Sequence, residues 1–191
     1  MRFSTSNKGA GKRLIIFAAA VSTVGVLGAW AHSQNVYVNI SGCVPEGLYV
    51  PHAMPKARVL QRGEYVLFCP PLDNPEIRFA KRRGWLGTNG SCPDGVIPFI
   101  KTVGAVAGDT VSVTERGGIR IDGHHVDDAF VRATTLGGAP MPHVPFGTRV
   151  VPKGSFFALA TDSPDAFDSR YYGDIRVSSV RYRMTPLFVW H

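Results

Sequence analysis

Three side chains of this sequence have the chemistry of a nucleophile, a base and an acid. Cys43 lies in the segment NISGCVPEGLY, in which glycine and proline neighbours predict a tight, rigid turn that exposes the thiol. Lys101 is the one charged residue of the apolar run 96–106. Asp168 stands in the segment FDSRYYG, just before a glycine turn. Nucleophilic catalysis is built from such groups if the fold brings them together.

The apolar surroundings of Lys101 decide what its amine can do. A continuous apolar strand is usually buried on both faces of a sheet. Burial disfavours the charged form of an ammonium group, and a neutral lysine can act as a general base near neutral pH. Taken alone, however, the segment favours a lysine whose head group extends to solvent.

The chain has three cysteines. Cys69 and Cys92 flank a loop, and in an oxidising compartment such a pair predicts a disulfide. Cys43 is then the odd thiol of an exported domain and a candidate reactive group. A buried, inert thiol that packs as a small hydrophobic side chain remains the alternative for Cys43.

In this order and at this spacing, the three segments resemble the conserved boxes of the type I signal peptidase superfamily. The greatest similarity is to the TraF-type conjugative transfer signal peptidases, membrane-anchored enzymes that process pilin precursors. The first box, Asn-x-Thr/Ser-x-Ser-x-Pro-x-Gly-Leu-Tyr, is matched by Asn39, Ser41, Pro45, Gly47, Leu48 and Tyr49. The lysine box, Lys-x-Val-x-Ala-x-x-Gly-Asp, is matched by Lys101, Val103, Ala105, Gly108 and Asp109. The acid box is matched by Asp168, Ser169, Arg170, Tyr171 and Gly173.

The resemblance implies roles for the first two boxes. Cys43 stands where the family's nucleophilic serine is expected, which is a departure from the family pattern. Lys101 would take the proton of the nucleophile. The backbone N–H of Cys43 and the hydroxyl of Ser41 would stabilise the oxyanion.

The acid box would support this site by the same resemblance. Asp168 would orient the lysine, while Arg170 and Ser169 would hold the box together. Many bacterial signal peptidases have a serine that contacts the lysine at the position of Ala166 in this chain. That contact is therefore expected to be missing or replaced.

Three alternatives stay open at this point. Ser41 could be the nucleophile, although its spacing to Pro45 argues against this role. Cys43 and Lys101 could instead rest as a thiolate–ammonium pair. The chain could also be a membrane-anchored β module of a transfer apparatus that binds partners without catalysis, but the presence of both Lys101 and Asp168 argues against it.

The segments that must position these side chains predict β-strands, and the resemblance implies an all-β fold. Alternating, β-branched stretches predict strands at 35–40 and 63–68. The stretches 110–114 and 119–121, followed by the hairpin signal at 122–123, predict a small β-meander.

The resemblance implies how these elements are grouped. It predicts signal-peptidase-like antiparallel β-sheets, with a catalytic β core over 33–109 and 156–191 and a smaller β cap over 110–155. Within the core, Asn74 can cap a short helix that ends at Gly84.

The N-terminal region predicts a membrane anchor. A basic tail over 1–13 precedes the uncharged run 14–30, and no basic residue follows until Lys56. This asymmetry predicts a single transmembrane helix over 14–32, with the tail in the cytoplasm and the remainder facing the periplasm from the inner membrane. A cleaved signal peptide that ends in the Ala-x-Ala-like sequence at 29–31 is the alternative.

The formal charge of +7 raises the question of which partners this chain binds. No regularly spaced aromatic residues accompany the basic residues, so we expect no nucleic-acid binding. Attraction to anionic lipid headgroups is the simpler explanation of the positive charge. No metal or cofactor is expected, because no ligand set surrounds His124 and His125. The expected partners are the lipid bilayer and a pilin precursor or another exported protein. By resemblance, that protein is cleaved or has its new termini joined.

Overall fold

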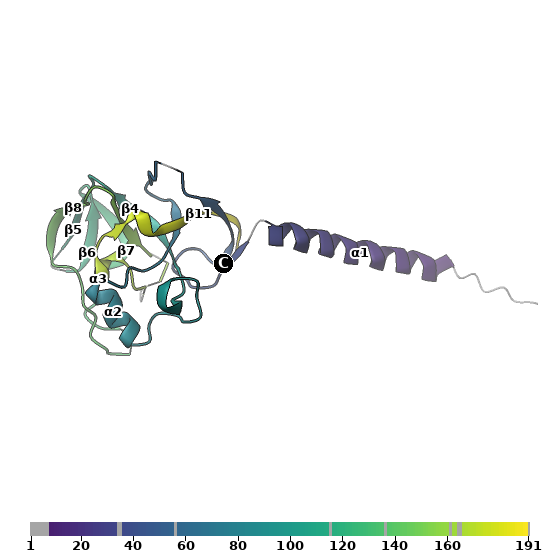
Figure 1. Ribbon diagram of the computed structural model, residues 1–191, viewed down its shortest axis with the longest axis horizontal. Helices are drawn as coiled ribbons and strands as arrows, with labels where there is room; N and C mark the ends of the chain where they lie inside the picture. The colour runs from purple at the N-terminus through teal and green to yellow at the C-terminus, as the bar shows by residue number, and fades with distance from the viewer. Residues whose placement is uncertain are drawn as a thin grey trace, which may run out of the picture. The chain divides into compact units, whose positions relative to one another are not determined.

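The structure is a computed structural model, and it describes residues 8–33, 36–55, 57–114, 116–135, 137–160, 162–163 and 166–190. The chain divides into two units, Met1–Val36 and Tyr37–His191, and each is considered by itself. The first unit contains the helix α1 (Lys8–Ser33), and the second holds the sheets and all of the predicted site residues (Figure 1).

Helix α1 covers the apolar N-terminal run. The hydroxyls of Ser22 and Thr23 donate hydrogen bonds to the carbonyls of Ala18 and Ala19 one turn earlier, so these polar groups are satisfied within the helix. Within the described residues, no helix combines the length and apolar character needed to cross a membrane. The predicted transmembrane segment 14–32 therefore finds no support, although several of its side chains lie outside the described residues.

The larger sheet carries most of the second unit. In the described part of the chain it has seven strands in the order β1-β2-β11-β3-β4-β9-β10, and every neighbouring pair is antiparallel. Its strands are β1 (Tyr37–Asn39), β2 (Gly47–Ala53), β11 (Val180–Val189), β3 (Tyr65–Phe68), β4 (Phe99–Val106), β9 (Ser155–Leu159) and β10 (Ile175–Arg176). The C-terminal strand β11 inserts between β2 and β3, so the sheet joins segments from both ends of the unit.

The smaller sheet is formed by the middle of the chain. Its described strands are, in spatial order, β7 (His124–Phe130), β6 (Gly118–Ile121), β5 (Thr110–Val113) and β8 (Gly147–Val150). Asp122 and Gly123 both have positive φ angles, 48° and 80°, as a two-residue hairpin turn requires. The predicted antiparallel β architecture is confirmed. Residues 37–191 form one compact unit, and no boundary inside it marks off 110–155. The division into a catalytic core and a separate cap over 110–155 therefore stays a prediction.

Two apolar clusters connect these layers. Ala105, Phe157 and Leu159 of the larger sheet pack with Val111 and Ile119 of the smaller one. On the larger sheet, a second cluster buries one face of helix α2 (Pro75–Arg82). The first cluster therefore joins the two sheets at β4 and β9, and the second packs α2 on the larger sheet.

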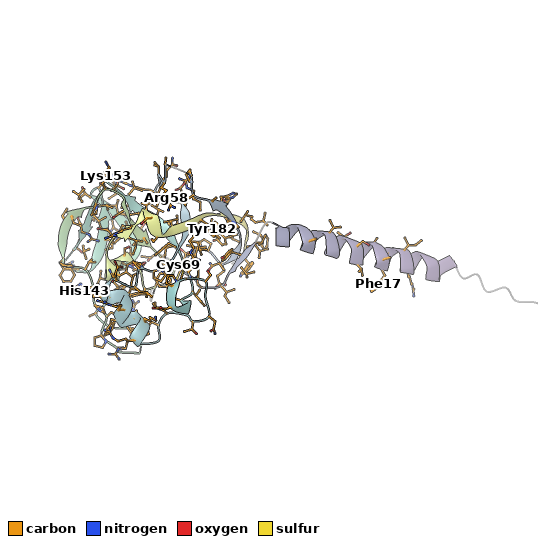
Figure 2. The ribbon with its side chains drawn as sticks, in the orientation of Figure 1. Phe17, Arg58, Cys69, His143, Lys153 and Tyr182 are labelled. Carbon is orange, nitrogen blue, oxygen red and sulfur yellow. A yellow bond between two sulfur atoms is a disulfide. The ribbon has the colours of Figure 1, made fainter. Side chains whose placement is uncertain are left out.

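Helix α2 begins as the sequence predicts. The side chain of Asn74 accepts hydrogen bonds from the backbone N–H groups of Glu76 and Ile77, and Pro75 occupies the first turn. The loop that contains this helix is closed by the predicted Cys69–Cys92 disulfide, near the Cys69 label of Figure 2. Closing a loop of this length stabilises the fold by about 3 kcal/mol in the chain-entropy model.

Arg62 ties the two sheets together by ion pairs. Its guanidinium donates to Asp109, at 2.6 Å between Nε and Oδ2, and also contacts the carboxylate of Asp122. The hydrogen bond from Arg62 is the largest cause that holds the pKa of Asp109 below its ordinary value of 3.8. Asp109 also accepts a 2.7 Å hydrogen bond from the backbone N–H of Val106, and thereby fixes the end of β4.

We expect this arrangement to make stability depend on pH in the acid range. A carboxylate with a lowered folded pKa stabilises the fold above pH 3.8, and this stabilisation is lost as the pH falls through the folded value. Arg62→Leu should lower the melting temperature by a few degrees at neutral pH and weaken its acid dependence. Thermal unfolding of both proteins from neutral to acid pH tests this, and parallel curves would contradict it.

Candidate active site

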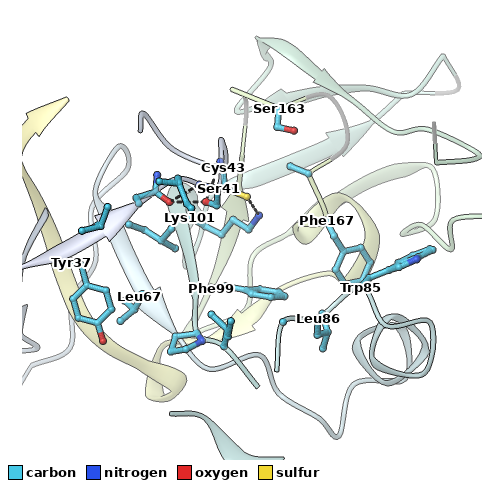
Figure 3. A pocket seen from close by; sticks show the side chains of 18 of the residues that line it. Tyr37, Ser41, Cys43, Leu67, Trp85, Leu86, Phe99, Lys101, Ser163 and Phe167 are labelled. Carbon is cyan, nitrogen blue, oxygen red and sulfur yellow. Dashed lines mark hydrogen bonds between the residues drawn. The ribbon is translucent and has the colours of Figure 1, made fainter. Parts of the chain in front are cut away.

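The thiol of Cys43 and the amine of Lys101 lie in direct contact. The distance between Lys101 Nζ and Cys43 Sγ is 3.0 Å, and the bond is drawn as a dashed line in Figure 3. Lys101 is 3% exposed, and its Nζ atom lies 5.6 Å from the ring centroid of Phe99. The lysine therefore points into the protein and does not reach solvent.

This contact depends on the curvature of the larger sheet. Cys43 follows β1 and precedes β2, whereas Lys101 is on β4, which is three strand positions from β2. In a flat sheet, three strand spacings would separate these elements by about 14 Å. A lysine side chain cannot span that gap alone, so the curl of the sheet and the path of the connecting turn 40–46 together bring Cys43 to β4.

Ser41 lies in the same turn but does not contact the base. Its hydroxyl donates a 2.7 Å hydrogen bond to the side-chain oxygen of Asn39 and accepts a 3.4 Å hydrogen bond from the backbone N–H of Cys43. Among the described residues, no hydrogen bond joins Ser41 to Lys101. The geometry therefore favours Cys43 over Ser41 as nucleophile.

Among the described residues, no hydrogen bond or ion pair joins Asp168 to Lys101. Its carboxylate, which is fully buried, accepts hydrogen bonds from Arg170 Nε and Nη2, both at 2.8 Å, and from the backbone N–H of Ala160 at 2.8 Å. Asp168 is expected to orient the lysine, but no direct hydrogen bond between the two described side chains supports this role. The physical reason is that the planar guanidinium engages both carboxylate oxygens.

Arg170 is the centre of this buried network. It is 1% exposed, and its guanidinium also donates to the carbonyls of Phe130 at 2.9 Å and Ala160 at 3.1 Å. Burial acts to lower the pKa of Arg170, but the charge and hydrogen bonds of Asp168 outweigh it, so the pKa is raised. Arg170 thus remains a permanent cation that connects β7, the end of β9 and the acid box.

Ser169 extends this support to the sheet. Its hydroxyl accepts a 2.9 Å hydrogen bond from the backbone N–H of Ala158 on β9. The same residue begins the short helix α3 (Ser169–Tyr172), whose N-terminus is capped by the Asp168 side chain. The acid box is therefore a structural brace behind the Cys43–Lys101 pair.

An apolar cavity of about 860 Å³ opens beside the pair (Figure 3). Cys43 and Lys101 line it together with apolar side chains from several separate parts of the chain. These side chains include Val38, Leu67, Trp85, Leu86, Phe99 and Phe167. The size and lining are those of a site for an apolar ligand segment, and the shielded surroundings favour chemistry away from bulk water.

Sequence reasoning missed the contribution of Trp85 and Leu86 to this cavity and the buried position of Asn39. Trp85 and Leu86 come from the irregular loop that the disulfide closes, and only their large apolar side chains in a loop could have indicated a role. Ala166 lines the cavity where a serine was expected in relatives, so no hydroxyl is supplied there. Asn39 was noted only as a match to the first box, yet it is buried within the turn.

The sequence of this chain is similar to a known protein family and to several known proteins. A family model described as "Signal peptidase, peptidase S26" matches residues 11–188. The "Conjugal transfer protein TraF" of Agrobacterium fabrum is 36% identical over 153 residues, which cover 80% of this chain and 82% of that protein. The "Plasmid transfer protein TraF" of Escherichia coli is 29% identical over 177 residues, covering 91% and 96% respectively.

One solved structure is also similar to this chain. It is a signal peptidase I from Enterococcus faecalis, with a TM-score of 0.38 and 19% sequence identity. The match covers 66% of this chain and 97% of the other.

Proposed function

The chain belongs to the signal peptidase family, peptidase S26, as a TraF-type member, and we propose that it cleaves the precursor of a conjugative pilin with Cys43 as its nucleophile. The observation that carries this proposal is the 3.0 Å contact between the thiol and the amine of Lys101. A nucleophile within hydrogen-bond reach of a buried base is the arrangement that covalent catalysis requires.

The proposed reaction proceeds in two steps. Cys43 Sγ attacks the carbonyl carbon of the scissile bond while Lys101 Nζ takes the thiol proton. The C–N bond then breaks, and the leaving amine receives that proton from Lys101. Water, or the amino terminus of the same polypeptide, attacks the resulting thioester and releases the thiol. Water gives a linear product, and the amino terminus gives a ring.

The oxyanion of each step would be held by donors in the Cys43 turn. The backbone N–H of Cys43 makes a long 3.4 Å hydrogen bond to Ser41, and a substrate oxygen can replace this weak bond. The Ser41 hydroxyl donates its single proton to the Asn39 side chain in this structure, so it would act as the second donor only after rotating away from that bond. A single donor of this kind contributes about 3 kcal/mol to transition-state stabilisation.

The substrate is proposed to bind in an extended form along β4. This strand pairs with β3 as far as Phe99, but its pairing with β9 begins at Thr102. Within the described residues, the edge of 99–101 that faces away from β3 has no strand partner. A peptide that adds there by backbone hydrogen bonds would place its side chains in the apolar cavity and its carbonyl near Cys43.

We further propose that the protein works in the periplasm, next to the inner membrane. The Cys69–Cys92 disulfide supports an oxidising compartment. The basic N-terminal residues Arg2, Lys8, Lys12 and Arg13 are suited to anionic lipid headgroups. A pilin precursor or another exported protein would meet the enzyme at this surface.

Co-expression with a pilin precursor tests this function. We expect the intact chain to yield a processed product and Cys43→Ala to yield none, a loss of at least about 10³-fold. Mass spectrometry separates the two outcomes of the thioester, because a cyclic product is one water lighter than the linear one. Processing by Cys43→Ala would instead assign the nucleophile to Ser41. A failure of the intact chain on every precursor tested would favour a binding module.

A further inference from the structure

The side chain of Asn39 holds both arms of the turn that carries Cys43. Asn39 ends β1 and is 6% exposed. Its amide nitrogen donates to the carbonyls of Val44 at 3.0 Å and Pro45 at 3.2 Å, which follow the cysteine. Its amide oxygen accepts from the backbone N–H of Ser41 at 3.2 Å and from the Ser41 hydroxyl at 2.7 Å. One side chain therefore connects the residues before and after the nucleophile.

We propose that Asn39 is a positioning residue that fixes the Cys43 thiol against Lys101 and directs the Cys43 N–H toward the attacked carbonyl. This inference rests on the proposed function, because it deepens the role of the same site. Asn39 contacts Ser41 and the turn backbone, so it acts through them and does not itself touch the reacting atoms. Without this clamp, the turn would be free to move the thiol away from the amine, which is 3.0 Å away.

The chemistry of a primary amide explains why asparagine suits this position. The clamp needs donors toward two carbonyls at one end and an acceptor toward an N–H and an O–H at the other. Asparagine supplies both in one short, planar group. An aspartate would place a carboxylate oxygen against two carbonyl oxygens, and an aliphatic side chain would leave buried polar groups unpaired. Gly42, with φ at 61°, lets the chain reverse within this short span.

Tyr49 offers a matched control for the clamp. Its hydroxyl donates a 2.6 Å hydrogen bond to the same Pro45 carbonyl that Asn39 contacts, and its side chain is fully buried. No hydrogen bond from Tyr49 to Ser41 is present among the described residues. Tyr49→Phe therefore removes a brace from one arm of the turn, while the connection between the arms through Asn39 persists.

Alkylation of Cys43 measures the position of the thiol without any knowledge of the substrate. Cys69 and Cys92 are joined, so Cys43 carries the free thiol among the chain's three cysteines. The reaction rate with iodoacetamide is measured without reductant at neutral pH and at alkaline pH, where any thiol is ionised. The ratio of the two rates cancels differences in accessibility. It then reports how far a nearby amine assists loss of the thiol proton.

We expect Lys101→Met to lower this ratio about tenfold, and Asn39→Leu to lower it by a similar factor. Tyr49→Phe should keep it within about twofold of the unaltered chain. Ser41→Ala removes the shortest bond of the clamp. Because Ser41 is exposed, this substitution should disturb the fold little, and it should lower the ratio by about threefold. Thermal unfolding of each variant shows whether it is folded.

The outcomes separate the inference from the function on which it rests. If Lys101→Met lowers the ratio and folded Asn39→Leu does not, the dyad stands and the role of Asn39 is overturned. If Tyr49→Phe lowers the ratio as much as Asn39→Leu does, any brace of the turn suffices and the proposal is also overturned. Should Asn39→Leu not fold, an unchanged ratio in Ser41→Ala would reject the clamp. If Lys101→Met has no effect, the thiol–amine pairing itself fails.

Discussion

Lys101→Met is expected to reduce peptide-bond cleavage by about 10⁴-fold while leaving the fold intact. Lys101 is 3% exposed on β4, where its aliphatic stem lies in an apolar layer. Methionine is unbranched and similar in length, so it can fill the same space and removes only the amine. The expected loss is large because Cys43 would then lack a proton acceptor at 3.0 Å. The rate is measured on a synthetic peptide that spans the processing site of the pilin precursor.

Lys101→Arg separates the two ways in which the lysine could act. An arginine remains cationic and cannot take a proton, because its pKa lies far above neutral pH. If Lys101 works as a general base, the arginine variant should be as inactive as the methionine variant. If a positive charge beside a thiolate is sufficient, arginine should retain measurable activity. Cleavage by Lys101→Met within about tenfold of the unaltered chain would contradict any such role.

Local sequence patterns located both members of this pair, whereas their pairing was expected only from the family resemblance. The apolar run around Lys101 and the glycine–proline turn around Cys43 are local patterns, and both can be recognised directly. Their contact depends on the strand order of the larger sheet and on the path of the turn that brings Cys43 over β4. Strand order of this kind is set by pairing between distant segments, which no local pattern records.

The acid box also shows that a local motif cannot predict contacts with distant parts of the chain. The motif predicts that Asp168 and Arg170 act together, and they do form a buried ion pair. The motif cannot show that Ala160 and Phe130 supply the remaining hydrogen-bond partners, since these come from other parts of the chain. The expectation that Asp168 orients the lysine came from the family resemblance, whereas the hydrogen bonds of the carboxylate in the folded chain brace the end of β9.

Arg170→Met should lower the free energy of unfolding by about 3–5 kcal/mol, because it leaves the Asp168 carboxylate buried without its counter-charge. Asp168 is fully buried and Arg170 is 1% exposed, so water cannot replace the lost partner. The carbonyls of Phe130 and Ala160 would lose their donors as well. Urea unfolding of the two proteins under identical conditions measures the difference.

A double variant tests whether the buried charge is the cause. Asp168→Asn combined with Arg170→Met removes both charges, so it should be less destabilised than Arg170→Met alone. Additive losses would show that each side chain stabilises the fold independently of the other. If the pairing is the cause, the double variant should also retain more cleavage activity than Arg170→Met at a temperature where part of the single variant is unfolded. The acid box would then contribute to catalysis by holding β9 and α3 in place behind the Cys43–Lys101 pair.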